Sequence, residues 1–166
     1  MAVALIVLVA GTLVAAAIDL RSRRIPNLLT GAMAAAAIAI HLFDGPTALL
    51  LAIAAMIAAF ALGTLAFSAG WFGGGDVKLI AAACGLVGYP GAIALVLFTL
   101  VGGAVLALAE VARQRRLVSF VKNAVAVATT GSAPDTPTVL PYGVAIAGGS
   151  IAYAISTLVP ALRLPL

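Results

Sequence analysis

The chain has 166 residues, of which 64% are hydrophobic and 8% are charged. A soluble domain carries about 25% charged residues, so this composition excludes an ordinary soluble protein. The net charge of +4 does not indicate a nucleic-acid partner. The basic residues lie beside hydrophobic stretches and are not interleaved with aromatic residues, which is typical of membrane topology signals.

The hydrophobic stretches predict an all-α, polytopic membrane protein with about six transmembrane helices. A helix that crosses a bilayer needs roughly 20 apolar residues, and barrel strands would alternate apolar and polar positions, whereas residues 32–40 and 48–66 are continuously apolar. Cutting the chain at charges, prolines and glycines predicts spans at 2–18, 28–43, 47–68, 77–89, 91–109 and 140–160.

The individual segments differ in character. The first lacks a basic region before its apolar run, so we expect a retained helix and not a signal peptide. The fourth is short and begins at a run of glycines, which suggests a helix that enters the membrane from a loop buried among its neighbours. Residues 113–128 predict an amphipathic interfacial helix, and residues 129–137 a flexible loop. We find no domain boundary and expect a single transmembrane domain over residues 1–166.

The basic residues alternate between the connections. Those after the first, third and fifth spans contain all of them except Arg163, and those after the second and fourth contain none. Loops rich in Lys and Arg stay in the cytoplasm, so we expect the odd-numbered connections there.

The single cysteine, Cys84, excludes an internal disulfide and a zinc site built from several cysteines. A small apolar packing role explains it. No cluster of metal ligands is visible, and we expect neither a metal nor a cofactor.

Two of the five carboxylates stand out. Asp44 lies in a predicted turn, Asp135 in the polar loop, and Glu110 begins a basic stretch, so each has a structural explanation. Asp19 and Asp76 instead lie at the cytoplasmic margins of hydrophobic spans, where a carboxylate is costly unless it is paired or functional.

Asp19 and Asp76 are predicted to lie on the same side of the membrane and could meet. Within roughly 3 to 6 Å, one pKa is raised and the pair can share a proton near neutral pH. The ionised carboxylate would then take a proton from water, and the protonated one would donate to the carbonyl oxygen and the leaving nitrogen of an amide. The only histidine, His41, is expected at the opposite margin as a structural residue, and no base accompanies the serines and threonines.

The sequences around the two aspartates are distinctive. Residues 72–79 read Phe-Gly-Gly-Gly-Asp-Val-Lys-Leu, and glycines permit backbone conformations and close approaches that other residues do not. The spacing of the lysine does not fit a phosphate-binding P-loop. Residues 19–27 read Asp-Leu-Arg-Ser-Arg-Arg-Ile-Pro-Asn, a tight basic hairpin whose Pro26 can occupy a first helical turn. Taken alone, this hairpin is equally well explained as a positive-inside loop in which Asp19 neutralises an arginine.

Together these motifs resemble the type IV prepilin peptidases, membrane aspartyl proteases of the GxGD class. The chain carries a G-x-G-D motif followed by Val-Lys, and an upstream D-x-R-x-x-x-I-P-N loop. Pro141-Tyr142-Gly143 resembles a P-[YF]-G motif of the family, with Val144 in place of the second proline that often follows. The resemblance covers nearly the whole chain by span order and motif position.

The resemblance implies that Asp19 and Asp76 are the catalytic aspartates of a leader peptidase. Its substrate would be a prepilin-like protein cut on the cytoplasmic side of a bacterial inner membrane, with the lipid bilayer as the other partner. The oligomeric state stays open. The residues that match the motifs around the aspartates are Gly73, Gly75, Lys78, Arg21, Pro26, Asn27, Pro141 and Gly143.

The larger bacterial members carry an N-terminal cytoplasmic region with paired cysteines that is associated with methylation of the new N-terminus. The resemblance here is to the short form of Flp or tight-adherence pili, for which we do not expect methyl transfer.

Two other functions remain as alternatives. A non-catalytic assembly subunit of a pilus or secretion system would keep the fold without activity. A small transporter would use Asp19 and Asp76 as proton or cation sites, but it predicts carboxylates near the middle of the membrane.

Overall fold

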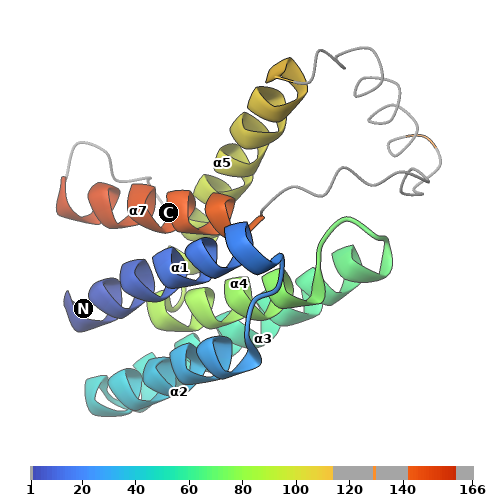
Figure 1. Ribbon diagram of the computed structural model, residues 1–166. Coiled ribbons are helices and arrows are strands. Elements are labelled where there is room, and N and C mark those ends of the chain that lie inside the picture. Colours follow the sequence, from blue (N-terminus) through green and yellow to red (C-terminus); the bar gives the residue numbers. More distant parts are fainter. Residues whose placement is uncertain (1, 114–128, 130–141, 160–166) are drawn as a thin grey trace.

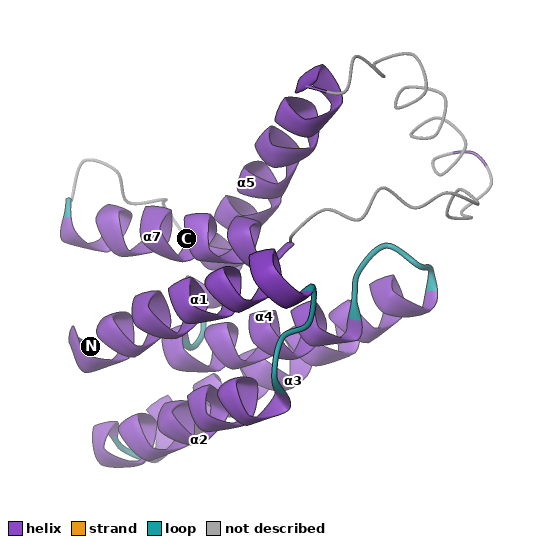
Figure 2. Ribbon diagram, in the orientation of Figure 1, coloured by secondary structure: helices purple, strands orange, loops and turns teal. Residues whose placement is uncertain are grey.

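The computed structural model describes residues 2–113, 129 and 142–159 of the chain. Helices and short connections account for these residues, and no strand occurs among them (Figure 2). The described helices are α1 (Ala2–Ser22), α2 (Asn27–Asp44), α3 (Pro46–Ser68), α4 (Gly74–Val87), α5 (Gly91–Arg113) and α7 (Tyr142–Leu158).

The prediction of an all-α polytopic membrane protein is confirmed. Four helices are long and apolar enough to cross a bilayer, namely α1, α2, α3 and residues 91–109 of α5, and α7 is a shorter apolar helix. The predicted amphipathic helix at 113–128 and the loop at 129–137 lie almost entirely outside the described residues.

The helix termini differ from the predicted boundaries for local reasons. Helix α1 continues past the predicted residue 18 to Ser22 and carries Arg21 in its last turn, where a cation complements the helix dipole. The residue that follows it, Arg23, has a φ of 54°, in the left-handed region typical of the residue after a helix C-terminus. Pro26 is the N-cap of α2, with φ −64° and ψ 134°, so it precedes the first helical turn that we predicted it could occupy.

Helix α4 forms the centre of the bundle, because it packs against each of the other five described helices. Eight of its 14 residues are buried, from Val77 to Leu86. At about 1.5 Å per residue, 14 residues span only about 21 Å, less than the roughly 30 Å hydrocarbon core. Its neighbours α1, α2 and α3 run alongside it, whereas α5 rises away at a steep angle (Figure 1).

Contacts along the helices establish which ends lie together. Lys78 near the start of α4 bonds to Asn27 at the start of α2, and His41 near the end of α2 bonds to Leu86 near the end of α4, so these two helices run in parallel. The end of α1 meets the start of α7 at Gly143.

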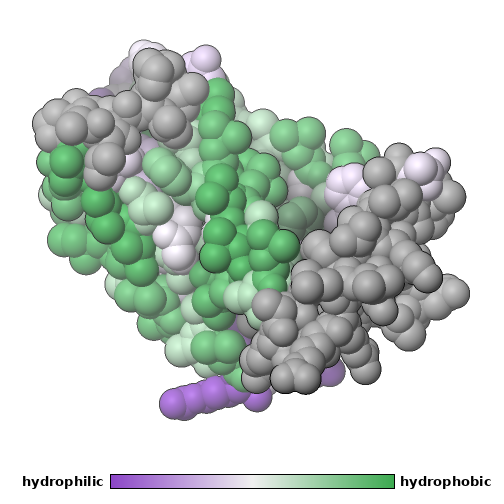
Figure 3. Space-filling view, turned by 90° about the horizontal axis from the view of Figure 1, so that it is seen from above, coloured by the Kyte–Doolittle hydropathy of each residue, from purple (hydrophilic) through white to green (hydrophobic). Residues whose placement is uncertain are grey.

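The outer surface of the bundle is strongly apolar. Leu28 and Phe43 are 85% and 89% exposed, and hydrophobic residues dominate the face in Figure 3, with hydrophilic residues at its edge. An apolar surface of this extent is suited to lipid.

Candidate active site

Asp19 lies in the last helical turns of α1 and is buried, with 8% of its surface exposed. The backbone N–H of Gly143, at the start of α7, donates a hydrogen bond of 3.1 Å to its Oδ2. This bond joins residues 124 positions apart in the chain. An N–H at a helix N-terminus favours a negative charge, both as a donor and through the helix dipole.

Gly143 makes the close approach of α7 to α1 possible. A Cβ atom at this position would lie 3.0 Å from Cβ and 3.1 Å from Oδ2 of Asp19, and 3.4 Å from Cα of Ala16. A larger residue would therefore push α7 away and lengthen the hydrogen bond to Asp19.

Asp76 lies in the first turn of α4 and is half-buried. The backbone N–H of Gly73 donates a hydrogen bond of 3.2 Å to its Oδ2, which satisfies one of the donors that a helix N-terminus leaves free. A Cβ atom on Gly73 would come within 2.8 Å of the same oxygen. The glycine is therefore needed for the carboxylate to fold back over the start of the helix.

The electrostatic surroundings raise the pKa of Asp76. This residue precedes the predicted span 77–89 and lies outside the four helices that are long enough to cross the membrane. Burial is the largest cause, the negative charge of Asp19 adds to it, and the hydrogen bond from Gly73 opposes it, so that the pKa rises from 3.8 to about 6. The structure thus brings the two predicted aspartates close enough for the charge of one to act on the other.

Gly75 packs closely against Ile25 in the connection between α1 and α2. A Cβ atom on Gly75 would lie 3.2 Å from Cβ of Ile25, so the connection between α1 and α2 packs directly on the first turn of α4. The glycines with positive φ are Gly45, Gly70 and Gly88. Gly75 is therefore required for close packing and not for an unusual backbone conformation.

Lys78 and Asn27 are brought together from motifs 51 residues apart, with Nζ donating to Oδ1 at 2.9 Å. Arg21 is exposed at the end of α1 and Pro26 caps α2. Pro141 lies outside the described residues.

Phe72 and Tyr142 form a contact that their sequence motifs do not predict. Their rings meet edge to face, with centroids 4.9 Å apart and planes inclined by 63°. This contact joins the connection before α4 to the start of α7, next to the two glycines that hold the aspartates. An aromatic residue inside each motif was the only sequence signal for this contact.

A cavity of about 160 Å³ adjoins Asp76 between α3, α4, α5 and α7. Its lining is apolar apart from Asp76 and Thr99. A second, larger hollow of about 480 Å³ lies between α2, α3 and α4 and is lined by Asn27 and Lys78, but by neither aspartate.

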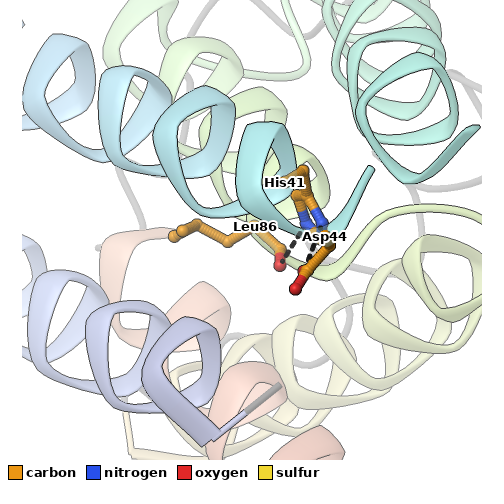
Figure 4. Close-up of polar contacts among 3 residues, drawn as sticks. All are labelled: His41, Asp44 and Leu86. Carbon is orange, nitrogen blue, oxygen red and sulfur yellow. Dashed lines mark hydrogen bonds and ion pairs between the residues drawn. The ribbon is translucent and has the colours of Figure 1, made fainter. Parts of the chain in front are cut away.

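His41 lies at the other end of α2 and α4, as expected (Figure 4). Its Nε2 donates to the carbonyl oxygen of Leu86 at 3.2 Å, and its Nδ1 is 3.3 Å from Oδ2 of Asp44. These contacts give the histidine a structural role far from Asp19 and Asp76. Among the residues that the structure describes, no group of three or more His, Cys, Asp or Glu is placed to hold a metal ion.

Comparison with known proteins identifies one family. The sequence model of the type IV leader peptidase family matches residues 6–108, a segment that includes Asp19, Asp76 and the helices that carry them. No curated protein and no solved structure matches the chain.

Proposed function

The chain belongs to the type IV leader peptidase family, and from this membership we propose that it is an aspartic endopeptidase with Asp19 and Asp76 as its catalytic dyad. It is a multi-pass membrane protease whose family implies a prepilin substrate. The observation that carries the proposal is the placement of the two aspartates: Asp76 is half-buried, and Asp19 lies close enough that its charge adds to the effect of burial in raising the pKa of Asp76.

The different surroundings of the two carboxylates suggest different roles. Asp19 accepts a hydrogen bond from a backbone N–H at the start of α7, which holds one of its carboxylate oxygens in place. Asp76, with a pKa of about 6, retains its proton more readily than an ordinary aspartate. We therefore assign Asp19 as the general base and Asp76 as the general acid.

Hydrolysis would proceed in two steps. Asp19 takes a proton from water as the water oxygen attacks the carbonyl carbon of the peptide bond, while Asp76 donates its proton to the carbonyl oxygen. The tetrahedral intermediate then collapses: the C–N bond breaks, and the leaving nitrogen takes the proton that Asp19 removed from water. The hydroxyl of the intermediate returns its proton to Asp76, which restores the starting state.

Positive charges support a cytoplasmic location for the site in a bacterial inner membrane. Arg21, Arg23 and Arg24 follow Asp19 directly, and Lys78 follows Asp76, all at the end of the bundle where α2 and α4 begin. The positive-inside rule assigns this end to the cytoplasm. The same placement disfavours a transporter, since both carboxylates lie near helix termini and not halfway along the helices.

Within the family, we propose that the substrates are Flp-type prepilins. The paired cysteines that accompany methyl transfer in larger members have no counterpart in this sequence, whose one cysteine, Cys84, is buried in α4.

The decisive experiment co-expresses the chain with a Flp-type prepilin and measures leader removal by mass spectrometry. Asn is nearly isosteric with Asp but cannot act as a carboxylic acid or base, so Asp19→Asn and Asp76→Asn should each abolish cleavage. Because the two residues act as one unit, the double variant should be scarcely worse than either single variant. Each should still co-purify with uncleaved prepilin.

Asp44→Asn is the matched control, because it makes the same chemical change at the opposite end of α2. It should leave cleavage intact. Normal cleavage by either single variant would remove that residue from the mechanism, and normal cleavage by both would refute the dyad.

A further inference from the structure

The orientation of the Asp76 carboxylate depends on the short connection before α4. One of its oxygens accepts the N–H of Gly73 at 3.2 Å, and a hydrogen bond weakens steeply as its angle departs from linear. This N–H belongs to the planar peptide unit that begins at Phe72. The side chain of Phe72 is partly buried and lines the apolar cavity together with Asp76. The placement of the Phe72 ring therefore constrains the direction in which the N–H donor points.

Asp19 is held in the same way by a distant part of the chain. The N–H of Gly143 donates to it at 3.1 Å, and that N–H belongs to the peptide unit that begins at Tyr142. Helix α7, which starts here, packs chiefly on α1 and α5 and only lightly on α4. Helix packing alone therefore ties the donor for Asp19 only weakly to the helix that carries Asp76.

The two aromatic rings connect these peptide units directly. Phe72 and Tyr142 meet edge to face with centroids 4.9 Å apart, an arrangement that aromatic pairs favour. The charge of Asp76 acts on Tyr142, so the ring contact lies beside this carboxylate. Displacement of either ring would turn one N–H donor relative to the other.

We propose that Phe72 and Tyr142 are positioning residues whose contact orients the two catalytic carboxylates relative to one another, through the N–H donors that follow the rings in the chain. The inference rests on the proposed function. The ring of Tyr142 carries this role, and its hydroxyl group takes no part in it.

The test removes one ring at a time from the full-length protein. Phe72→Leu and Tyr142→Leu keep an apolar side chain but lose the edge-to-face contact, whereas Tyr142→Phe keeps the ring and loses only the hydroxyl group. Trp71→Leu is the matched control, because Trp71 is the adjacent aromatic residue, is 49% exposed and makes no ring contact within the described part of the chain. Each variant is purified in lipid nanodiscs and assayed on a Flp-type prepilin over a range of pH.

We expect Phe72→Leu and Tyr142→Leu each to lower kcat by about 10- to 100-fold with little change in KM, because misplaced catalytic groups leave substrate binding intact but slow the reaction. The double variant should be scarcely worse than either single variant, since both substitutions remove the same contact. Tyr142→Phe and Trp71→Leu should retain close to the wild-type turnover.

The pH profile separates this role from a purely structural one. Burial and the charge of Asp19 raise the pKa of Asp76 to about 6 and outweigh the opposing hydrogen bond from Gly73. A looser arrangement would weaken both of the larger effects. The fall of kcat/KM with rising pH should therefore have its midpoint roughly half a pH unit or more lower in the two leucine variants than in the wild type.

Four results would overturn the proposal. Unchanged kcat in both leucine variants would refute the positioning role and leave the dyad intact. A lower kcat with an unchanged pH midpoint would assign the rings a role in folding only, because loss of folded protein does not move the midpoint. Losses that multiply in the double variant would mean that the rings act separately. A loss by Tyr142→Phe equal to that of Tyr142→Leu would mean that the hydroxyl group acts and not the ring contact.

A failure of the proposed function would look different from each of these results. A wild type that cleaves no prepilin would refute the proposed function and the positioning role with it.

Discussion

Gly75 lets the connection between α1 and α2 pack closely against the first turn of α4. Its missing side chain leaves room for Ile25, whose Cβ would be only 3.2 Å from a Cβ at residue 75. The packing between these residues holds the connection after Asp19 against the helix that carries Asp76.

Gly75→Val should abolish or strongly reduce cleavage while the protein still folds in the membrane. The branched side chain would displace Ile25 and shift the two aspartates relative to one another, and a misplacement of about 1 Å can cost on the order of 100-fold in rate. The measurements are leader removal and the circular dichroism spectrum. Gly148→Val is the control, because nothing lies within 4 Å of a Cβ at that exposed position. Wild-type turnover by Gly75→Val would show that the site tolerates this shift.

The raised pKa of Asp76 predicts how activity depends on pH. If Asp76 acts as the acid, kcat/KM should fall as pH rises through about 6, the value to which burial and Asp19 raise this pKa. The measurement is the pH profile of prepilin cleavage. A profile that rises through the same range would reverse the roles assigned to Asp19 and Asp76.

The same pKa shift has a consequence for stability. A carboxyl group whose pKa is higher in the folded state stabilises the protein fully below its unfolded pKa, and this contribution is lost as pH rises from about 4 to about 6. Asp76→Asn cannot ionise, so its melting temperature should exceed that of the wild type above pH 6, and the difference should shrink toward pH 4. A constant difference across this range would mean that ionisation of Asp76 does not destabilise the fold.

At the level of elements, α4 depends on α2 for the capping of its C-terminus. The carbonyl group of Leu86 is among those that the end of a helix leaves without an internal partner, and His41 of α2 donates to it. The bond between Lys78 and Asn27 links the same two helices at their other ends. Helix α2 therefore fixes both the axial position and the orientation of the helix that carries Asp76.

His41→Ala should destabilise the protein by about 1 to 3 kcal/mol, because it leaves a buried carbonyl group without its donor. Cleavage measured well below the melting temperature should change little. His41 contacts the C-terminal end of α4, whereas Asp76 lies in the first turn of that helix. His41→Gln retains an N–H donor and should recover part of the stability. A loss of cleavage by His41→Ala in folded protein would mean that this end of α4 controls the active site.

At the scale of the whole molecule, the two aspartates lie at one end of the bundle, and its outer surface is apolar. The connections after α1 and α3 and the start of α7 converge at the end that holds Asp19 and Asp76, through the contacts of Ile25, Phe72 and Tyr142. The large exposed apolar residues cover the outside. A protease with this arrangement can keep its aspartates at one end of the bundle while its apolar outer surface faces lipid.

The orientation of the bundle can be tested with single cysteines in a Cys84→Ala background. Arg24→Cys lies in the exposed connection beside the aspartates, and Phe43→Cys lies at the opposite end of α2, where the native side chain is 89% exposed. An impermeant maleimide added to intact cells should label position 43 and not position 24, and both should react in opened membranes. Labelling of position 24 alone would place the active site outside the cytoplasm.

The sequence by itself determined the class of the protein and singled out the two aspartates. In a bilayer only helices and closed barrels satisfy every backbone polar group, and continuous apolar runs lack the alternation of barrel strands, so helices are the remaining solution. Continuous apolar runs predicted all six described helices, with boundaries displaced by two to four residues at α1, α4, α5 and α7.

Only the tertiary structure decided which residues of the candidate site contact one another. The hydrogen bond between Gly143 and Asp19 spans 124 positions and the bond between Lys78 and Asn27 spans 51. The contact of Phe72 with Tyr142 and the cavity beside Asp76 likewise join segments that are far apart in the chain. Such contacts arise from the packing of helices around α4, and the order of residues along one helix does not specify which part of another helix will face it. The burial of Asp19 and the raised pKa of Asp76 follow from that packing.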